Sequence, residues 1–226
     1  MAVGVLAVII PAYNEETTVA LTVEACSRLR PVSEIIVVDD GSRDGTAEAA
    51  RRAGAKVLRL GRNCGKGEAL NLGLRHTRAP YLAFVDADIG ATAGELKRLW
   101  EPVEAGILDM AVGVLSPSAR RSPGLVRTLA RVGVYRLAGC RLRAPLSGQR
   151  VLDARVAQSL YPLAGGFGVE VDLTVRALWA GFRVGELPVA MSHRYTGNDW
   201  AGISHRSRQL WEVGCTLWHI SRTRRC

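Results

Sequence analysis

Short apolar runs alternate with helix-like segments along the first half of the chain. Five runs have the length and β-branched content of single strands, and they cover residues 5–10, 34–38, 56–60, 81–85 and 110–114. The helix-like segments between them cover residues 15–29, 46–52, 67–75 and 95–103, and Glu15 and Glu16 would lie in the first turn of the first helix, where the helix dipole favours acidic side chains. Strands that are apolar throughout and alternate with helices predict an α/β fold, a mainly parallel central sheet flanked by helices on both faces.

The second half of the chain is less regular. Residues 116–143 contain Pro117, Pro123 and many Arg, which favours a loop that leads into a basic helix. The elements predicted after it are a turn into a short strand at 146–150, a glycine-rich loop at 165–168, a helix at 169–180, a strand at 182–187, a loop at 193–198 and a terminal helix at 203–220. There is no internal repeat and no low-complexity linker, so we expect the 226 residues to form a single domain.

The charge balance is strongly basic. The chain has a formal net charge of +9, and Arg residues concentrate at 120–150 and 194–225. This balance indicates a polyanionic partner, such as nucleotide phosphates, an acidic acceptor, an anionic membrane or a nucleic acid, although Arg residues also serve as solvated helix faces. The terminal helix interleaves Arg with Trp211 and Trp218 without a nucleic-acid readout motif, so we expect no nucleic-acid partner and favour contact with a membrane surface or within a homodimer.

The cysteines and the first apolar run of the chain indicate the cellular compartment. The five Cys are scattered and form no C-x-x-C pair, which favours reduced thiols over disulfides or a zinc site. The first apolar run has no basic leader and is too short to span a bilayer, so it is expected to be a strand. The sequence therefore predicts a cytoplasmic protein, with peripheral membrane contact left open.

Two carboxylates, Asp86 and Asp88, follow the apolar run at 81–85 directly. Like charges this close repel each other, and a divalent cation with oxygen ligands neutralises them. A cation that also binds a diphosphate makes that diphosphate a leaving group. Polar residues also follow strands at 11–15 and 39–42, and although such residues favour tight turns as well, ligands of open α/β sheets bind at the carboxyl ends of strands. The sequence thus predicts one polar site at the edge of the sheet that is formed by the carboxyl ends of the strands.

Other polar residues are weaker candidates. The glycine-rich segment 61–67 has neither the Walker nor the dinucleotide-binding spacing, but Lys66 at the start of a helix can reach a phosphate or base. His193 is a candidate metal ligand, with His205 as its competitor, and a neutral imidazole suits manganese. Near the start of another helix, Glu170 and Asp172 are candidates for a general base or for holding substrate hydroxyls, and acidic residues there also stabilise the helix end.

Three motifs together resemble a known family. Pro-Ala-Tyr-Asn-Glu at 11–15, Val-Val-Asp-Asp-Gly-Ser-Arg-Asp-Gly-Thr at 37–46 and Phe-Val-Asp-Ala-Asp at 84–88 are similar to motifs of the GT-A nucleotide-sugar glycosyltransferases, in the superfamily of the dolichol-phosphate mannosyltransferases. The second half is more similar to the glucosyl-3-phosphoglycerate and mannosyl-3-phosphoglycerate synthases, through segments 65–70, 145–148 and 166–170 and the His193-Arg194 pair. The resemblance covers most of the chain.

The resemblance implies a role for each matching position. It assigns Asp88 and His193 to a Mg²⁺ or Mn²⁺ ion, and Asp88 and Glu170 to catalysis. The residues that it implies for the nucleotide-sugar are Pro11, Ala12, Tyr13, Glu15, Asp40, Ser42, Lys66, Asp86, Ala87, Leu146, Ser147 and Gly148. Those that it implies for the acceptor are Arg194, Gly168 and Ser122. Residues 1–114 would form the nucleotide-sugar-binding half and residues 115–226 the acceptor half with the terminal helix.

The expected activity is metal-dependent transfer of a hexose from a nucleoside diphosphate sugar, of the UDP-glucose or GDP-mannose type, to a small phosphorylated or acidic acceptor such as 3-phosphoglycerate. The alternative is an inverting polyprenyl-phosphate glycosyltransferase at the membrane surface. The chain is shorter than the phosphoglycerate synthases, residues 115–130 do not match their acceptor loop, and it lacks the hydrophobic tail of many polyprenyl-phosphate transferases. A nucleotidyltransferase is less compatible, because no glycine follows the first strand at 11–15, and a non-catalytic binding module would not need every polar element of a metal-nucleotide site.

Overall fold

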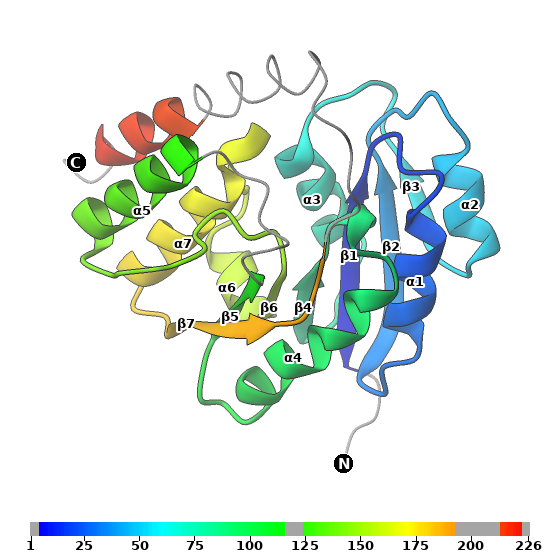
Figure 1. The fold of residues 1–226 in the computed structure, drawn as a ribbon, viewed down its shortest axis with the longest axis horizontal. Coiled ribbons are helices and arrows are strands. Elements are labelled where there is room, and N and C mark those ends of the chain that lie inside the picture. Colours follow the sequence, from blue (N-terminus) through cyan, green and yellow to red (C-terminus); the bar gives the residue numbers. More distant parts are fainter. Residues whose placement is uncertain (1–4, 116–123, 193–212, 223–226) are drawn as a thin grey trace.

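One seven-stranded sheet organises the chain (Figure 1). The computed structural model describes residues 5–115, 124–192 and 213–222. Its strand order is β3-β2-β1-β4-β6-β5-β7. The strands are β1 (Leu6–Ala12), β2 (Val32–Asp39), β3 (Lys56–Arg59), β4 (Tyr81–Phe84), β5 (Met110–Leu115), β6 (Arg150–Asp153) and β7 (Val184–Val189). The α/β class predicted from the alternating pattern is confirmed.

Strand β6 alone among these seven runs against its neighbours. It pairs antiparallel with β4 and with β5, whereas β1, β2, β3 and β4 are joined by parallel pairs, as are β5 and β7. Because the direction is reversed, the first residue of β6, Arg150, lies opposite Phe84 at the carboxyl end of β4. The residues just before β6 therefore lie at the same edge of the sheet as the residues just after β4. In a wholly parallel sheet these two groups would lie at opposite edges.

Helices cover both faces of the sheet. One face packs against α1 (Val19–Ser27), α2 (Thr46–Arg52), the 3-10 segment η1 (Ala87–Glu95) and α4 (Leu96–Glu104). The other packs against α3 (Lys66–Arg75), α6 (Ala154–Ser159) and α7 (Val169–Trp179). The central strands β1, β4, β5 and β6 are mostly buried on both sides, which explains why they are continuous apolar runs and not alternating ones, whereas the edge strands β3 and β7 are more exposed.

A further layer lies on α7, away from the sheet. Helix α5 (Gly124–Ala138) and the helical segment 213–222 share one apolar cluster with α7. Close approach of these helices depends on glycine: a side chain at Gly133 would overlap Leu217, and one at Gly168 would overlap Thr216. This is the basic helix expected from residues 116–143, and it begins at Gly124.

The first helix is shorter than its sequence predicts. It starts at Val19 and not at Glu15, so Glu15 and Glu16 do not occupy its first turn. The reason is tertiary: the Glu15 N–H donates to Thr46 Oγ1 at 2.8 Å, and the Glu16 carboxylate accepts from the Gly45 N–H at 3.1 Å. These bonds tie the segment to the loop after β2, and residues 16–18 form a turn, with the Val19 N–H donating to the Glu15 carbonyl at 3.0 Å.

Two further expectations concern thiols and membrane spans. The four cysteines within the described residues, Cys26, Cys64, Cys140 and Cys215, are free, as their unpatterned spacing predicts. In the part of the chain that the structure describes, no helix has the length and apolar character needed to cross a bilayer.

Stability should depend on acid pH through Asp109, where the turn before β7 joins the start of β5. The Arg183 guanidinium donates to both Asp109 oxygens, at 2.9 and 3.0 Å, and this hydrogen bonding lowers the pKa of Asp109. A carboxyl with a pKa lower in the folded than in the unfolded chain stabilises the fold above its unfolded pKa, about 3.9, and loses that contribution as the pH falls through the folded value. We expect the difference in urea midpoint between wild type and Asp109→Asn to shrink between about pH 6 and about pH 3. A difference that stays constant over this range would contradict the assignment.

Candidate active site

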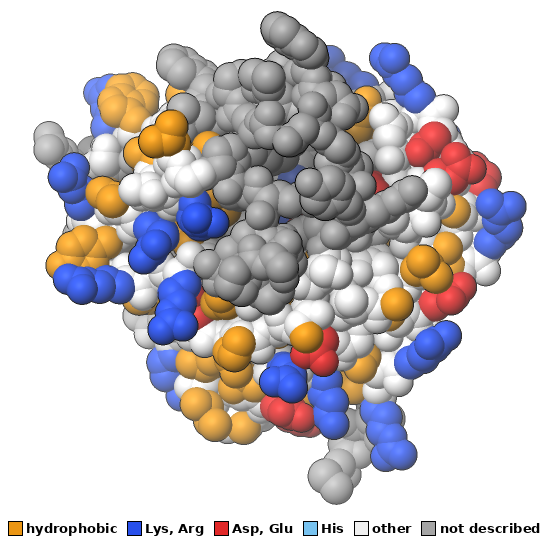
Figure 2. Space-filling view, in the orientation of Figure 1, with side chains coloured by type: hydrophobic (Ala, Val, Ile, Leu, Met, Phe, Trp, Pro, Cys, Tyr) orange, Lys and Arg blue, Asp and Glu red, His pale blue; other side chains and the backbone are white. Residues whose placement is uncertain are grey.

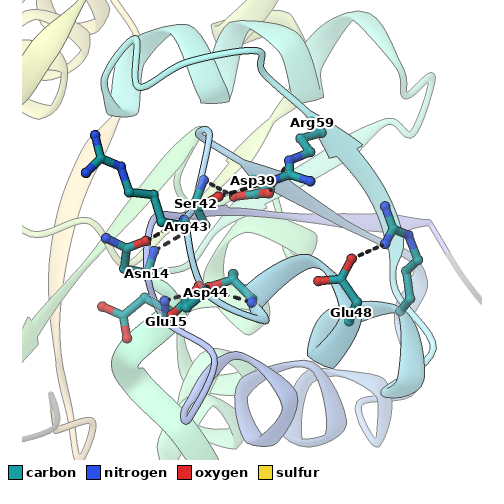
Figure 3. A network of polar contacts seen from close by, with 10 residues as sticks. Asn14, Glu15, Asp39, Ser42, Arg43, Asp44, Glu48 and Arg59 are labelled. Atoms are coloured by element: carbon teal, nitrogen blue, oxygen red, sulfur yellow. Dashed lines mark hydrogen bonds and ion pairs between the residues drawn. The ribbon is translucent and has the colours of Figure 1, made fainter.

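The loops after β1 and β2 are joined by backbone-to-side-chain hydrogen bonds (Figure 3). The Asn14 N–H donates to Ser42 Oγ at 2.9 Å, and the Arg43 N–H donates to Asn14 Oδ1 at 2.9 Å. Asn14 has a φ of 56°, a left-handed conformation that Asn tolerates better than most residues. Asp39 is fully buried, accepts from the Ser42 N–H at 2.9 Å and lies 3.0 Å from Arg59 Nε. Ser42 thus holds the two loops together from a buried position.

Asp40 holds the glycine-rich loop before α3. Its two carboxylate oxygens accept from the Cys64 and Gly65 N–H groups, at 2.7 and 2.8 Å. Burial raises the pKa of Asp40, while these amide donors oppose the rise. The Asp40 carboxylate therefore orders the glycine-rich segment 61–67, which has neither phosphate-binding spacing. This segment places Lys66 at the first position of α3.

The remaining candidates of the first strand end differ in exposure. Tyr13 is 40% exposed, Pro11 is half-buried, and Ala12 is buried. Glu15 accepts a hydrogen bond from the Thr18 hydroxyl at 2.6 Å. Of this group, Tyr13 offers the most accessible apolar surface at this edge of the sheet.

Lys66 lies between two carboxylates from distant parts of the chain. Its Nζ is 2.5 Å from Asp86 Oδ1, after β4, and 2.7 Å from Glu170 Oε1, in the first turn of α7. Burial alone would lower the pKa of Lys66, but the attraction of Asp86 and Glu170 outweighs it and raises this pKa. The lysine therefore stays charged and supplies a positive charge beside Asp86, a pairing that the sequence did not predict.

Gln149 fixes the other side of Asp86. Its amide Nε2 donates to Asp86 Oδ2 at 2.6 Å, and its Oε1 accepts from the Asp86 N–H at 3.2 Å. Gly148 leaves the room that this arrangement needs, because a side chain there would overlap Lys66 and Asp86. Both oxygens of Asp86 are thus engaged by protein donors.

A buried arginine supports this cluster from behind. Arg150 is 1% exposed and donates to the carbonyls of Ser147 and Pro145, at 2.9 and 3.0 Å, and to Thr174 Oγ1 at 2.8 Å. Burial lowers the pKa of Arg150 to about 10, so it remains charged at neutral pH. Thr174 in turn donates to the backbone carbonyl of Glu170 at 2.7 Å. Arg150 thereby connects the turn before β6 to the start of α7.

Asp88 is half-buried at the second position of η1, next to the buried Ala87. Asp86 is held by Lys66 and Gln149, and the assignment of Asp88 to a cation stays a prediction. Its hard oxygen ligands fit Mg²⁺ or Mn²⁺. Within the described ranges no group of three or more His, Cys, Asp or Glu side chains could hold a metal, and the predicted second ligand, His193, lies outside those ranges.

Several candidates lie elsewhere or outside the described residues. Leu146 packs against the cluster of α5 and α7, and Ser147 Oγ accepts from the Gln149 N–H at 3.4 Å. Gly168 faces Thr216, and Asp172 pairs with Arg176 at 3.0 Å. His193, Arg194, Ser122 and His205 fall outside the described residues.

Sequence reasoning did not single out Gln149 and Arg150. One signal was available: two polar residues open a strand that continues with Val151 and Leu152, and a buried strand begins with polar residues only where they find partners. The partners themselves, Asp86 and Thr174, could not be read from spacing.

A mainly parallel sheet with two carboxylates after β4 is the arrangement expected of a GT-A glycosyltransferase. The profile of glycosyl transferase family 2 matches residues 7–129, and the chain belongs to this family. It is 30% identical over 200 residues to the glycosyltransferase AglJ of Haloferax volcanii, a match that covers 85% of this chain and 64% of AglJ. It is 32% identical over 209 residues to the polyprenol monophosphomannose synthase of Mycolicibacterium smegmatis, covering 84% of this chain and 78% of that one.

A solved structure supports the fold assignment. The glucosyl-3-phosphoglycerate synthase of Mycobacterium tuberculosis, in complex with Mn²⁺, UDP and phosphoglyceric acid, superposes with a TM-score of 0.82 at 26% identity. The match covers 96% of this chain and 78% of the synthase. The chain is therefore a glycosyltransferase with the GT-A fold, as the motifs predicted.

Proposed function

We propose that the chain transfers a hexose from a nucleoside diphosphate sugar to a small phosphorylated or acidic acceptor, in a metal-dependent reaction. The observation that carries this proposal is the cluster at the end of β4: Lys66 shared by Asp86 and Glu170, with Asp88 two residues from Asp86. In this cluster the Lys66 ammonium is a positive charge held in place, and the carboxylates around it can take separate roles in binding the donor and the metal. Residues 1–114 would bind the donor and residues 115–226 the acceptor.

At the donor, Tyr13 would stack on the nucleoside and Lys66 would approach the diphosphate. Asp88, together with His193, would hold Mg²⁺ or Mn²⁺, which supplies positive charge to the departing diphosphate. Asp86 and Glu170 would accept hydrogen bonds from ribose and sugar hydroxyls. Lys66 holds both carboxylates in place, and Gln149 also holds that of Asp86. Crystals of the phosphoglycerate synthase with Mn²⁺ and UDP, and with Mg²⁺ and UDP, support this choice of cofactor.

We assign the acceptor from the similarity of the chain to the synthase and from the basic residue expected in the acceptor half. The synthase structure contains phosphoglyceric acid, and Arg194, with Ser122 and Gly168, would meet an acidic acceptor here. With such an acceptor we expect the anomeric configuration to be retained, and Glu170 to position the sugar without acting as a strong base. The four free thiols are consistent with a cytoplasmic enzyme.

A second acceptor class is a polyprenyl phosphate. The likeness to a polyprenol monophosphomannose synthase and the exposed apolar side chains of α5 favour it. In that reaction a phosphate oxygen of the lipid attacks the sugar and the configuration inverts. Proton NMR of the anomeric centre of the product distinguishes the two reactions.

The donor is tested by thermal shift with UDP-glucose and GDP-mannose, each with and without Mn²⁺. A ligand at a hundredfold excess over its dissociation constant stabilises the folded chain by about 2.7 kcal/mol. We expect one of the two donors to raise the melting temperature, and Mn²⁺ to increase that rise. No shift with either donor in the presence of Mn²⁺ would contradict the proposal.

A further inference from the structure

The outward face of α5 carries apolar side chains that are exposed to solvent. Leu125, Leu129 and Val132 are 77%, 37% and 42% exposed. Spacings of four and three residues place them along one face of the helix. Tyr135, one turn after Val132, is also exposed. Isolated exposed apolar residues need no explanation, but a row of them on one helix indicates a contact surface.

The same stretch is basic and contains no acid. Residues 124–143 include five arginines and no Asp or Glu. Four of these arginines, Arg131, Arg136, Arg141 and Arg143, are exposed, and the Arg141 guanidinium lies 5.1 Å from the Tyr135 ring centre. Figure 2 shows orange and blue side chains side by side over the region where Figure 1 draws α5.

The fold does not need this face. Helix α5 is anchored by its opposite side, where Val126, Ala130 and Val134 are buried against α7 and the segment 213–222. That segment lies beside α5 at Gly133 and adds an exposed Trp218, with Arg222 4.8 Å from its ring centre. Among the described residues, this cluster buries Val126, Ala130 and Val134 and leaves Leu125 and Val132 exposed.

We propose that the exposed face of α5 docks the chain on an anionic lipid bilayer. The helix would lie in the plane of the interface, with Leu125, Leu129 and Val132 inserted below the headgroups and the arginines at the lipid phosphates. Charge complementarity identifies this occupant. A nucleic acid would use the arginines but leave the aliphatic row in water. A second copy in a symmetric contact would set arginine against arginine, since this face contains no acid.

Binding to vesicles tests the proposal without donor, metal or acceptor, so its failure is separate from any failure of the proposed reaction. We expect the full chain to sediment with vesicles of phosphatidylcholine and phosphatidylglycerol, and much less with phosphatidylcholine alone. The double variant Leu125→Ser/Val132→Ser should bind at least about tenfold more weakly, because two large apolar contacts are lost. The matched control is Leu21→Ser/Ile107→Ser, which changes two similarly exposed residues on other elements and should bind as wild type does.

Charge is tested in the same assay. Arg131→Glu/Arg136→Glu should weaken binding to the anionic vesicles, and Arg51→Glu/Arg52→Glu on α2 should weaken it less. The proposal is overturned if the chain does not bind anionic vesicles, if it binds neutral vesicles equally well, or if control and α5 variants lose binding to the same degree. It is also overturned if the chain is a dimer that the α5 variants convert to a monomer, since the face would then join two copies.

Discussion

Replacing Asp88 with Asn is expected to abolish the effect of Mn²⁺ on donor binding and to reduce the rate of sugar transfer by at least about a hundredfold. The amide has nearly the shape of the carboxylate but lacks the charge that holds a divalent cation. Asp88 is half-buried in η1, outside the apolar core, so the fold should be kept. Thermal shift with donor, with and without Mn²⁺, and initial rates measure the two effects.

The matched control for this substitution is Asp109→Asn, which makes the same change beside Arg183 at the opposite edge of the sheet, just before β5. It should keep the full Mn²⁺ response. If Asp88→Asn binds donor with an unchanged Mn²⁺ response, the cation is held elsewhere and the assigned site is wrong. If both variants lose the response, the loss reports general destabilisation.

Replacing Arg150 with Met is expected to lower the free energy of unfolding by about 3–5 kcal/mol, the usual cost of removing one member of a buried charged network. Two buried carbonyls and the Thr174 hydroxyl lose their donor, and Glu170 and Asp86 lose a nearby positive charge. Urea unfolding monitored by circular dichroism measures the change. The residue is almost fully buried, so solvent cannot replace the lost donors.

Arg155→Met is the control for that change. Arg155 pairs with Asp153 on the surface, and its loss should leave the urea midpoint close to the wild-type value. Arg150→Lys should lie between, because one ammonium cannot reach all three acceptors that the planar guanidinium reaches. A cost below about 1 kcal/mol for Arg150→Met would mean that apolar packing compensates for the network.

Local sequence predicted most of the elements that form this sheet. Apolar runs of strand length placed β1 to β5 within about two residues, because buried parallel strands need no alternation. The carboxylates Asp86 and Asp88 were found from the same pattern, since a charged pair after an apolar strand is conspicuous. Helix α2 was placed at Thr46–Arg52, as observed.

What the sequence could not supply are contacts between segments far apart. The late start of α1 depends on bonds from Glu15 and Glu16 to residues after β2, which no local pattern records. A divalent cation was expected to neutralise the Asp86 and Asp88 pair, and Asp86 was assigned to the nucleotide-sugar, but no local pattern showed that Lys66 and Gln149 take both Asp86 oxygens. Gln149 reaches Asp86 only because β6 runs antiparallel, and strand direction is a property of the whole sheet.

The reversed direction of β6 has a consequence for engineering. Side chains alternate between the two faces of a strand, so a one-residue shift in the register of β6 would turn Arg150 toward the opposite face and draw Gln149 away from Asp86. Surface connections usually tolerate length changes, but the connection at 139–149 leads directly into a strand whose first residue, Arg150, lies beside the site. Chimeras that exchange the second half of this enzyme with a relative should therefore join outside that connection, and libraries should vary its composition at constant length.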